Sequence, residues 1–437
     1  MKYVSTRGST SISLDEALVK GIADDGGLFV PVKLPVFTAG DFGRAKNLID
    51  VAAIMLAPFF AGSSLSPDLS VVLAETFYFP IPITPVSGAA GQAKLLELFH
   101  GPTSAFKDVG AGFLASCLSR LESDDDSPLT ILVATSGDTG GAVAAAFDKR
   151  PGMRVVVLFP DGRVSDRQAQ QLTCWSDNVL SLAVNGSFDD CQALAKAAMA
   201  NESLSASYRF SSANSINIGR LLPQSTYYGD ASLRHYRDTG IKPGFIIPTG
   251  NLGNALACIM AREMGLPIGS IILATNANRT IPEYFDTLEW LPRSSIQTLA
   301  SAMDVGDPSN MERLRGLLGD AGALRDQIGV VSVDDEQIKA SIREDFAEFG
   351  FATCPHTATA THAWRHLDAD TRASHDWILI ATAHPAKFET VVEPLIGCTV
   401  PLPPELEAIL SRPSRSVKID PSLNALADVM HDRFVST

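Results

Sequence analysis

One lysine stands among residues that would shield an amine from water. Lys107 lies in the segment HGPTSAFKDVGAGF (His100–Phe113), between small and aromatic residues and just before a stretch of helical character. Most lysines lie on the surface and are charged. An amine that is partly shielded from water has a lowered pKa and can form a Schiff base with a carbonyl. Lys107 is therefore a candidate nucleophile for carbonyl chemistry.

Two glycine-rich segments are candidate anion sites. ATSGDTGGAVAAAF (Ala134–Phe147) and PTGNLGNALA (Pro248–Ala257) each follow an expected strand and precede an expected helix. Small residues let the backbone approach a ligand closely, and free amides at a helix N-terminus bind phosphate without a cationic side chain. The hydroxyls of Ser136 and Thr139 add polar groups to the first segment. One such loop is more often a plain strand-to-helix turn, but two in one chain favour a phosphate-bearing ligand.

Other reaction chemistries lack their motifs. The sequence contains no G-x-x-x-x-G-K-[ST], no G-x-G-x-x-G with an acidic residue at the right distance, and no G-x-S-x-G. Nucleotide hydrolysis, NAD binding and a serine hydrolase thereby lose their main support. His362 and His366 have a spacing that can bind zinc, but no third ligand and no H-E-x-x-H pattern accompanies them. We expect packed or solvated helix residues there, and no metal.

The elements that would position these residues alternate along the chain. Several short runs are apolar throughout, which is typical of parallel strands covered on both faces. The expected strands are Thr130–Ala134, Arg154–Phe159, Val179–Val184, Phe245–Pro248, Ile271–Ala274 and Trp377–Ala381. Strands separated by helices predict a doubly wound α/β architecture. Ligands of such sheets bind beyond the carboxyl ends of the strands, where both glycine-rich segments lie.

The first 86 residues differ from the rest in showing helical periodicity and few strand runs. The proline-rich segment FPIPITPV (Phe79–Val86) indicates a linker. Val51–Ala61 is apolar, but it is too short to span a bilayer and contains Pro58, so we expect a core helix. Further on, the acidic run Glu122–Asp126 indicates an exposed loop.

Composition sets the class of protein. The 437 residues suit two or three domains, and 46% of them are apolar. With 35 basic and 49 acidic side chains the net charge is -14, which disfavours binding of nucleic acid through general phosphate attraction. The N-terminus MKYVSTRGSTS shows no secretory signal, and the six scattered cysteines form no C-x-x-C pair. We expect a reduced, cytoplasmic protein with buried thiols.

Five ordered motifs resemble the threonine synthase family, in its bacterial and fungal branch. They are HGPT-x-AFKD, TSGDTG, SANSINIGR, P-[ST]-GN-x-G and TAHPAKF, and they span His100 to Phe388. The segment ADDGGLFVP (Ala23–Pro31) is similar to that family's N-terminal domain, and the likeness is weakest after Cys398. The family belongs to the tryptophan-synthase-β-like, fold type II pyridoxal-phosphate enzymes. Its members convert O-phospho-L-homoserine and water to L-threonine and inorganic phosphate.

The resemblance implies pyridoxal 5'-phosphate as cofactor. Lys107 would hold it covalently and then act as acid and base at successive substrate carbons. The GNLGN loop would bind its phosphate, and Thr382 would place a neutral hydroxyl beside the pyridine nitrogen, which suits elimination and replacement more than transamination. Asp138 stands where many relatives outside this branch have Asn, and because an ionised Asp cannot donate a hydrogen bond, only proximity to the ring oxygen is assigned to it. The expected cofactor-binding residues are Lys107, Asp138, Gly250, Asn251, Leu252, Gly253, Asn254 and Thr382.

The resemblance also implies a separate site for the substrate. Its carboxylate would meet the loop that holds Ser136, and its phosphate would meet SANSINIGR, where Arg220 could bind it with a bidentate fork. Lys387 and, less directly, His384 would add positive charge, whereas His356 has no assigned role. The expected substrate-binding residues are Thr135, Ser136, Gly137, Thr139, Asn214, Ser215, Asn217, Arg220 and Lys387.

These observations predict an α/β enzyme with doubly wound, mostly parallel sheets in two lobes, the cofactor between them, and an N-terminal accessory domain. The expected division is an N-terminal domain over residues 1–86, a catalytic region over 87–400 and a C-terminal tail over 401–437 that packs on it. The expected reaction is γ-elimination of phosphate followed by β-addition of water, the last step of threonine biosynthesis. Two alternatives remain: a phospho-lyase that releases a keto acid, and a cofactor-binding protein without turnover. The expected partner is O-phospho-L-homoserine, with no nucleic acid and no membrane, and the protein would be a monomer or homodimer.

Overall fold

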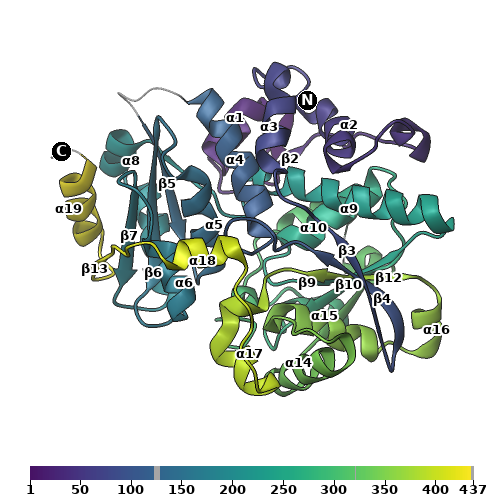
Figure 1. The fold of residues 1–437 in the computed structure, drawn as a ribbon. Coiled ribbons are helices and arrows are strands. Elements are labelled where there is room, and N and C mark those ends of the chain that lie inside the picture. Colours follow the sequence, from purple (N-terminus) through teal and green to yellow (C-terminus); the bar gives the residue numbers. More distant parts are fainter. Residues whose placement is uncertain (123–127, 320, 435–437) are drawn as a thin grey trace.

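Two α/β lobes lie side by side beneath an N-terminal domain (Figure 1). The computed structural model describes residues 1–122, 128–319 and 321–434. We call the part built on the five-stranded sheet the small lobe, and the part built on the six-stranded sheet the large lobe. Most of the acidic run after Glu122 lies outside the described residues.

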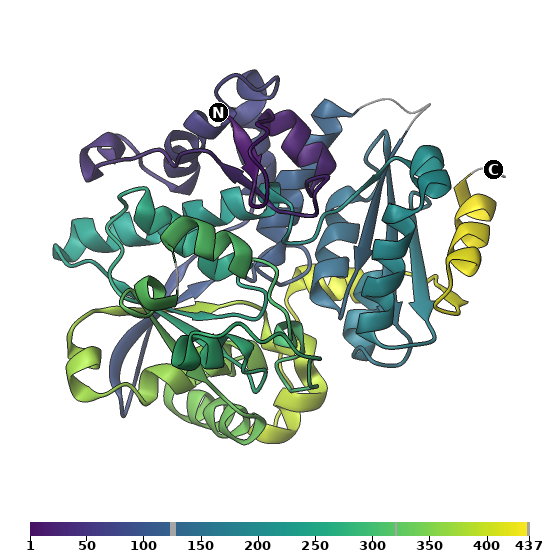
Figure 2. The same cartoon turned by 180° about the vertical axis from the view of Figure 1, so that it is seen from behind.

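The small lobe is a parallel sheet in the order β13-β7-β6-β5-β8. Its strands are β5 (Leu129–Ala134), β6 (Met153–Pro160), β7 (Val179–Val184), β8 (Phe210–Ser211) and β13 (Val417–Ile419). Alternate side chains divide between two cores: Ile131 and Val133 lie in one, Leu132 and Ala134 in the other. Helices cover both faces (Figures 1 and 2): α4 (Lys107–Leu121), α5 (Asp138–Phe147), α6 (Asp166–Thr173), α7 (Phe188–Ala200) and α8 (Glu202–Tyr208). Burial on both faces explains the unbroken apolar runs of these strands.

The large lobe has the sheet order β11-β10-β9-β12-β4-β3, in which only the pair β3–β4 is antiparallel. Its strands are β3 (Ile83–Gly88), β4 (Gly91–Glu97), β9 (Gly244–Pro248), β10 (Ile271–Thr275), β11 (Ile328–Ser332) and β12 (Trp377–Ala381). Its principal helices are α9 (Ile218–Thr239), α10 (Gly253–Glu263), α11 (Thr280–Thr287), α12 (Met311–Leu318), α14 (Asp335–Phe349), α15 (Pro355–Arg365) and α17 (Glu389–Ile396). The doubly wound, mostly parallel architecture is confirmed, and all six expected strands occur within two residues of their expected ends.

The interpretation of Phe79–Val86 as a linker was wrong in its second half. Ile83–Gly88 is the edge strand β3, paired with β4 across a tight turn at Gly88 and Gly91. A proline is tolerated on an edge strand because one of its sides needs no ladder hydrogen bond, which accounts for Pro85. The half-exposed pattern of β3 lacks the apolar run that identified the other strands.

The N-terminal domain packs on α4 and α9 (Figure 1). It comprises the strands β1 (Tyr3–Ser5) and β2 (Phe29–Pro31) and the helices α1 (Leu14–Lys20), α2 (Leu48–Phe60) and α3 (Leu69–Thr76). Ser13 begins α1 with a capping box, and Asn47 caps α2, which is the expected core helix. Phe60 of α2 meets Phe113 of α4 edge to face at 5.9 Å, so the domain shares its core with the lobes.

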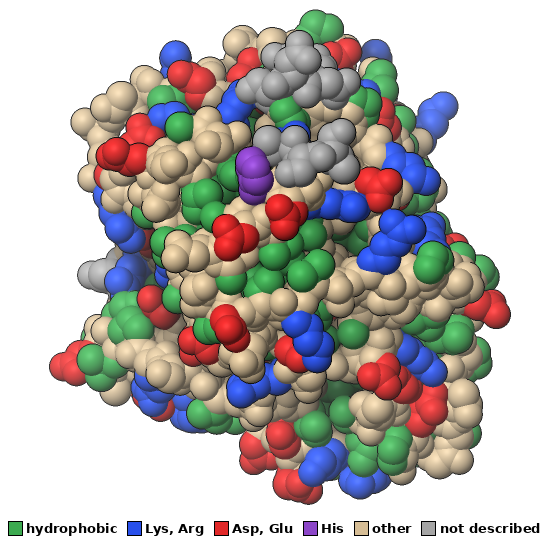
Figure 3. Space-filling view, turned by 90° about the vertical axis from the view of Figure 1, so that its left-hand side faces the viewer, with side chains coloured by type: hydrophobic (Ala, Val, Ile, Leu, Met, Phe, Trp, Pro, Cys, Tyr) green, Lys and Arg blue, Asp and Glu red, His purple; other side chains and the backbone are tan. Residues whose placement is uncertain are grey.

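The last described residues pack on the small lobe. Helix α18 (Pro404–Leu410) lies against α6, β13 extends the sheet next to β7, and α19 (Leu423–Phe434) lies against α7. Acidic and basic side chains are interspersed on the face shown in Figure 3. Five cysteines are buried as expected, but Cys398 is exposed. No helix among the described residues is long and apolar enough to cross a membrane.

Candidate active site

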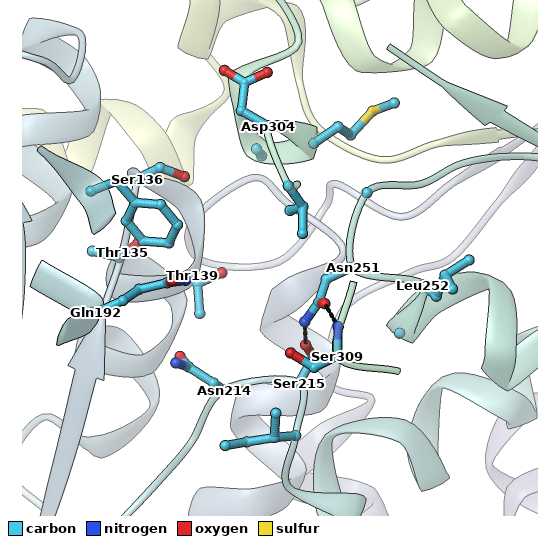
Figure 4. Close-up of a pocket in the computed structure, with 18 of the residues that line it drawn as sticks. Thr135, Ser136, Thr139, Gln192, Asn214, Ser215, Asn251, Leu252, Asp304 and Ser309 are labelled. Carbon is cyan, nitrogen blue, oxygen red and sulfur yellow. Dashed lines mark hydrogen bonds between the residues drawn. The ribbon is translucent and has the colours of Figure 1, made fainter. Parts of the chain in front are cut away.

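A cavity of about 600 Å³ lies between the lobes, at the carboxyl ends of β5 and β9 (Figure 4). It is lined by the starts of α4, α5 and α10 and by the segment that precedes α9. This is where ligands bind in doubly wound sheets.

Lys107 is the first residue of α4 and enters the cavity from a tightly bonded loop. Ser104, with φ of 55°, turns the chain in a left-handed conformation that non-glycine residues rarely adopt. The Phe106 N–H donates to the Thr382 carbonyl (2.8 Å), and the His384 N–H donates to the Ser104 carbonyl (3.0 Å). The AFKD and TAHPAKF motifs, far apart in sequence, therefore form one wall of the site.

The electrostatic surroundings of Lys107 favour a reactive amine. Burial, opposed by the carboxylate of Asp138, lowers the pKa of Lys107 to about 8. The positive charges of Lys387 and Arg220 act in the same direction as burial. A lysine whose pKa lies near neutral pH can act as a nucleophile and a base.

The GNLGN segment forms the turn between β9 and α10. Leu252, with φ of 63°, occupies the N-cap position of α10 in a left-handed conformation, so that the helix begins facing the cavity. The first amides of a helix have no partner within it and attract anions. A side chain at Gly250 would meet the Met303 backbone at 2.6 Å, which explains the glycine there.

The TSGDTG segment makes a similar turn between β5 and α5. The Thr135 hydroxyl accepts hydrogen bonds from the N–H groups of Gly137 (3.0 Å) and Gly140 (2.9 Å). Gly137, with φ of 139°, adopts a conformation that favours glycine, and a Cβ there would lie 2.7 Å from Gln168. The turn leaves Ser136 and Thr139 on the cavity wall.

Asp138 forms a buried ion pair with Lys387. The Lys387 ammonium lies 2.8 Å from the Asp138 carboxylate and also donates to the Thr103 carbonyl (2.7 Å). Burial alone would raise the pKa of Asp138, but the charges of Lys387 and Lys107 hold it well below its usual range. Asp138 is therefore an ionised acceptor beside Lys107, and Lys387 has its charge matched inside the protein.

Arg220 lies almost fully buried near the start of α9. Its guanidinium donates to the Ala213 carbonyl and to the Lys107 carbonyl (3.5 Å). Burial lowers its pKa to about 10, so it stays charged at neutral pH. Gly110 makes room for it, since a Cβ there would lie 2.8 Å from Arg220 Nε.

Unsatisfied polar atoms mark the cavity as a site for a polar ligand. Among the described residues, four cavity-lining side chains carry a buried atom without a hydrogen-bond partner: Asn214 Oδ1, Arg220 Nε, Asn254 Nδ2 and Thr382 Oγ1. Buried polar groups are nearly always hydrogen-bonded, so these atoms await a partner. An amine, a hydroxyl, a helix N-terminus and a cation are the groups that pyridoxal phosphate and a second anion require. The residues present fit that cofactor.

Most residues singled out in the sequence meet in this cavity. Its lining includes Lys107, Thr135, Ser136, Asp138, Thr139, Asn214, Ser215, Arg220, Gly250, Asn251, Leu252, Gly253, Asn254 and Thr382. Four others lie outside the lining: Gly137, Asn217, His384 and Lys387. Asn217 donates to the Leu18 and Ser212 carbonyls and accepts from the Gly219 N–H, so its side chain is occupied.

Sequence reasoning missed other parts of the wall. His356 lines the cavity, accepts a hydrogen bond from the Ala302 N–H (3.0 Å), and has its pKa lowered to about 4 by burial, so it is neutral. Gln192 of α7 and Asp304 also contribute (Figure 4). Gln192 lies in the helix that follows the carboxyl end of β7, and that position was the available signal.

Comparisons with known proteins point to one family. Residues 2–77 match the family "Threonine synthase N terminus", 77–383 match "Pyridoxal-phosphate dependent enzyme", and 357–430 match "Threonine synthase, C-terminal". The chain is 36% identical to the threonine synthase of Escherichia coli over 421 residues, 96% of each chain, and 33% identical to that of Pseudomonas aeruginosa over 450 residues, 95% of each. The crystal structure of the E. coli enzyme gives a TM-score of 0.89 at 35% identity, covering 99% of this chain and 100% of that one. A pyridoxal-phosphate-bound threonine synthase from Brucella melitensis gives 0.90 at 32% identity, covering 99% of each.

Fold and site together define a fold type II enzyme whose cofactor is pyridoxal 5'-phosphate. Within that class the likeness extends over nearly the whole chain and includes both terminal regions. The chain belongs to the threonine synthase family.

Proposed function

We propose that this protein converts O-phospho-L-homoserine and water to L-threonine and inorganic phosphate. The observation that carries the proposal is that a reactive amine and a buried cation line one cavity: Lys107 and Arg220 both border it, and the Arg220 guanidinium donates to the backbone carbonyl of Lys107 (3.5 Å). A substrate with an amino group at one end and a phosphate at the other needs these two groups within one small cavity. The unpartnered atoms of Asn214, Asn254 and Thr382 would supply further polar contacts.

Lys107 has two tasks in this proposal. Pyridoxal phosphate, when bound, supplies an electron sink for negative charge on the substrate carbons. The Lys107 amine first holds the cofactor and, once the substrate amine has replaced it, accepts and returns protons at those carbons. Its lowered pKa suits both tasks, because a proton-transfer group works best near the ambient pH.

Arg220 would bind the phosphate that leaves. The phosphate departs from the γ-carbon with the electron pair of the C–O bond, so negative charge grows on its oxygen. The buried Arg220 guanidinium, which lines the cavity together with Asn214 and Ser215, would stabilise that charge. Water then supplies the hydroxyl of the β-carbon, and protons complete the methyl group.

Two residues first expected to bind the substrate take other roles in this proposal. Lys387 compensates the charge of Asp138, and Asn217 holds the chain before α9. Their polar groups already have protein partners. Breaking those buried hydrogen bonds to bind a ligand instead would leave the partners unsatisfied, which is costly. Gly137 serves by its conformation. The cofactor loop Gly250–Asn254, Thr382, and the hydroxyl residues Thr135, Ser136 and Thr139 keep their expected roles.

The domain division, the oligomeric state and the location of the protein complete the proposal. We propose the domain division expected from the sequence, with boundaries at residues 86 and 400; strand β3 crosses the first of them. We further propose a cytoplasmic monomer or homodimer that does not bind nucleic acid, in keeping with the net charge of -14.

One incubation tests the function. Purified protein with pyridoxal phosphate is mixed with O-phospho-L-homoserine, and the products are identified by chromatography. Threonine with an equal amount of phosphate supports the proposal. Phosphate with a keto acid would identify a phospho-lyase, and no phosphate release would leave only cofactor binding.

A further inference from the structure

A buried arginine outside the cavity connects the N-terminal domain with the substrate side of the site. Arg313 lies in α12, and only 2% of its surface is exposed. Its Nε donates to the Phe29 carbonyl of β2 (3.1 Å). Its Nη1 donates to the Ser215 carbonyl (3.2 Å) and Nη2 to the Ile216 carbonyl (2.6 Å). The guanidinium thus gathers peptide oxygens from two segments that are far apart in sequence.

We call residues 212–217 the anion loop, because Asn214 and Ser215 line the cavity beside Arg220. In one peptide unit the C=O and N–H groups point in opposite directions. The Ser215 carbonyl faces Arg313, so the N–H of Ile216, a cavity-lining residue, faces the other way. The Asn217 N–H closes a turn onto the Asn214 carbonyl (3.0 Å). Arg313 therefore sets which peptide groups of the anion loop face the ligand.

The same arginine controls the neighbouring cofactor loop through Asn310. Arg313 Nη1 donates to Asn310 Oδ1 (2.8 Å), which directs the Asn310 amide nitrogen to the Asn251 carbonyl (3.0 Å). Asn251 in turn donates to the Ser215 hydroxyl (2.7 Å) and accepts from the Ser309 N–H (2.6 Å), as Figure 4 shows. The Ser215 hydroxyl is thereby held at the boundary between the two loops.

Further contacts of the N-terminal domain reach the anion loop and Ser211, the residue before it. The Ser211 hydroxyl donates to the Val19 carbonyl (2.6 Å), and Asn217 donates to the Leu18 carbonyl (2.9 Å). A Cβ at Gly21 would lie 3.1 Å from the Ser212 carbonyl, so the domain approaches the loop closely. Arg7 forms a two-bond ion pair with Glu312, the neighbour of Arg313 (2.9 Å each).

We propose that Arg313 is a positioning residue which, braced against the N-terminal domain at Phe29, fixes the anion loop in the conformation that binds the substrate phosphate. Within the described chain its four hydrogen bonds end on carbonyl oxygens of peptides or of an amide side chain. A planar fork with several fixed donors suits this arrangement, whereas a lysine could satisfy only part of it. The proposal rests on the proposed function for the identity of the anion, but not for the geometry.

Variants at two positions of α12 test it. Arg313→Ala and Arg313→Lys remove all or part of the fork. Arg315→Met is the matched control, because Arg315 stacks on the rings of Tyr284 and Trp290, away from the cavity. For both Arg313 variants we expect KM for O-phospho-L-homoserine to rise at least tenfold, with kcat changed by less than threefold and the visible band of bound cofactor retained. Millimolar guanidinium should restore KM in Arg313→Ala and have no such effect in the control.

A second measurement does not depend on turnover. Hydrogen exchange of residues 212–217 is recorded in the holoenzyme with and without inorganic phosphate. Phosphate should slow exchange in the wild type and in Arg315→Met, but not in Arg313→Ala or Arg313→Lys. If wild-type protein makes no threonine, the proposed function fails while this comparison still decides the role of Arg313. Unchanged KM and wild-type phosphate protection in Arg313→Lys would overturn the inference, even if Arg313→Ala did not fold.

Discussion

Burial is the largest influence on the pKa of Lys107, and Asp138 opposes it. With a pKa of about 8, roughly a tenth of the amine is unprotonated at pH 7, far more than for a lysine in water. The rate at which cofactor-free protein takes up pyridoxal phosphate should therefore rise with pH and level off above about 8. Stopped-flow recording of the visible band measures this rate, and Lys107→Ala, which has no amine to react, is the control.

Linkage gives the same shift a second consequence. Between pH 8 and 10.5 the unfolded chain keeps the proton on Lys107 while the folded, cofactor-free chain has lost it. The unfolded state then binds more protons, so this group makes the folded protein more stable as pH rises through that window. The uptake experiment with pyridoxal phosphate tests the pKa shift behind both consequences. An uptake rate that still rose steeply at pH 9.5 would show that the Lys107 amine is solvated.

Arg220 offers the sharpest test of the anion site. Arg220→Ala should lower kcat/KM for O-phospho-L-homoserine about a hundredfold or more, equivalent to roughly 3 kcal/mol, because a buried charge at the leaving group is lost. Arg220→Lys should restore only part of this, since a point charge replaces a fork. Steady-state kinetics measure both, with Arg237→Ala, near the other end of the same helix, as control. If Arg220→Ala lost the visible band of the cofactor, or reacted at the wild-type rate, the site for the substrate's phosphate would lie elsewhere.

At the scale of elements, we expect the turn into α10 to set the affinity for the cofactor. Gly253 has no left-handed backbone; that conformation belongs to Leu252, so Gly253→Val acts by crowding and not by strain. A Cβ at Gly253 would lie 3.2 Å from the Ser215 Cβ, and the two further methyl groups of valine would push the cofactor loop from the anion loop. We expect the Kd for pyridoxal phosphate to rise at least tenfold, measured by equilibrium dialysis. Gly112→Ala in α4, where a Cβ has open space, should leave it unchanged.

The elements divide clearly into those that sequence could predict and those it could not. Strands such as β5 and β12 are buried on both faces, so their composition alone identified them. The hairpin β3–β4 lies at a sheet edge and carries Pro85 and Lys94, which interrupt the apolar pattern. Motifs likewise predicted which segments meet, but not which way a side chain points. Lys387 belongs to a site motif, yet its partner is Asp138, 249 positions away by number (387 − 138), and no local pattern encodes that contact.

At the scale of the whole molecule, the N-terminal domain is a separate sequence region but not a separate core. Sequence composition distinguished residues 1–86 from the rest, and two of the matched families meet at residue 77. One continuous cluster of buried side chains nevertheless includes Phe59 and Phe60 of α2, Phe113 of α4 and Tyr228 of α9. Such sharing depends on three-dimensional packing between distant segments, which periodicity along the chain cannot reveal.

This shared core predicts that the N-terminal domain and the catalytic part unfold together. Phe60 is almost completely buried and contacts Phe113 of the catalytic part edge to face. Phe60→Ala should cost about 3–5 kcal/mol, because it removes buried apolar surface and leaves a cavity that the surrounding helices can only partly close. Since both sides of that cavity lose contacts, differential scanning calorimetry should show the transition of the catalytic part shifting to lower temperature together with that of the N-terminal domain. Tyr78→Ala, at a mostly exposed ring in the following connection, is the control and should shift it little. A separate early transition in Phe60→Ala, with the main transition left at its wild-type temperature, would mean that the N-terminal domain folds on its own and rests on the lobes only through its surface.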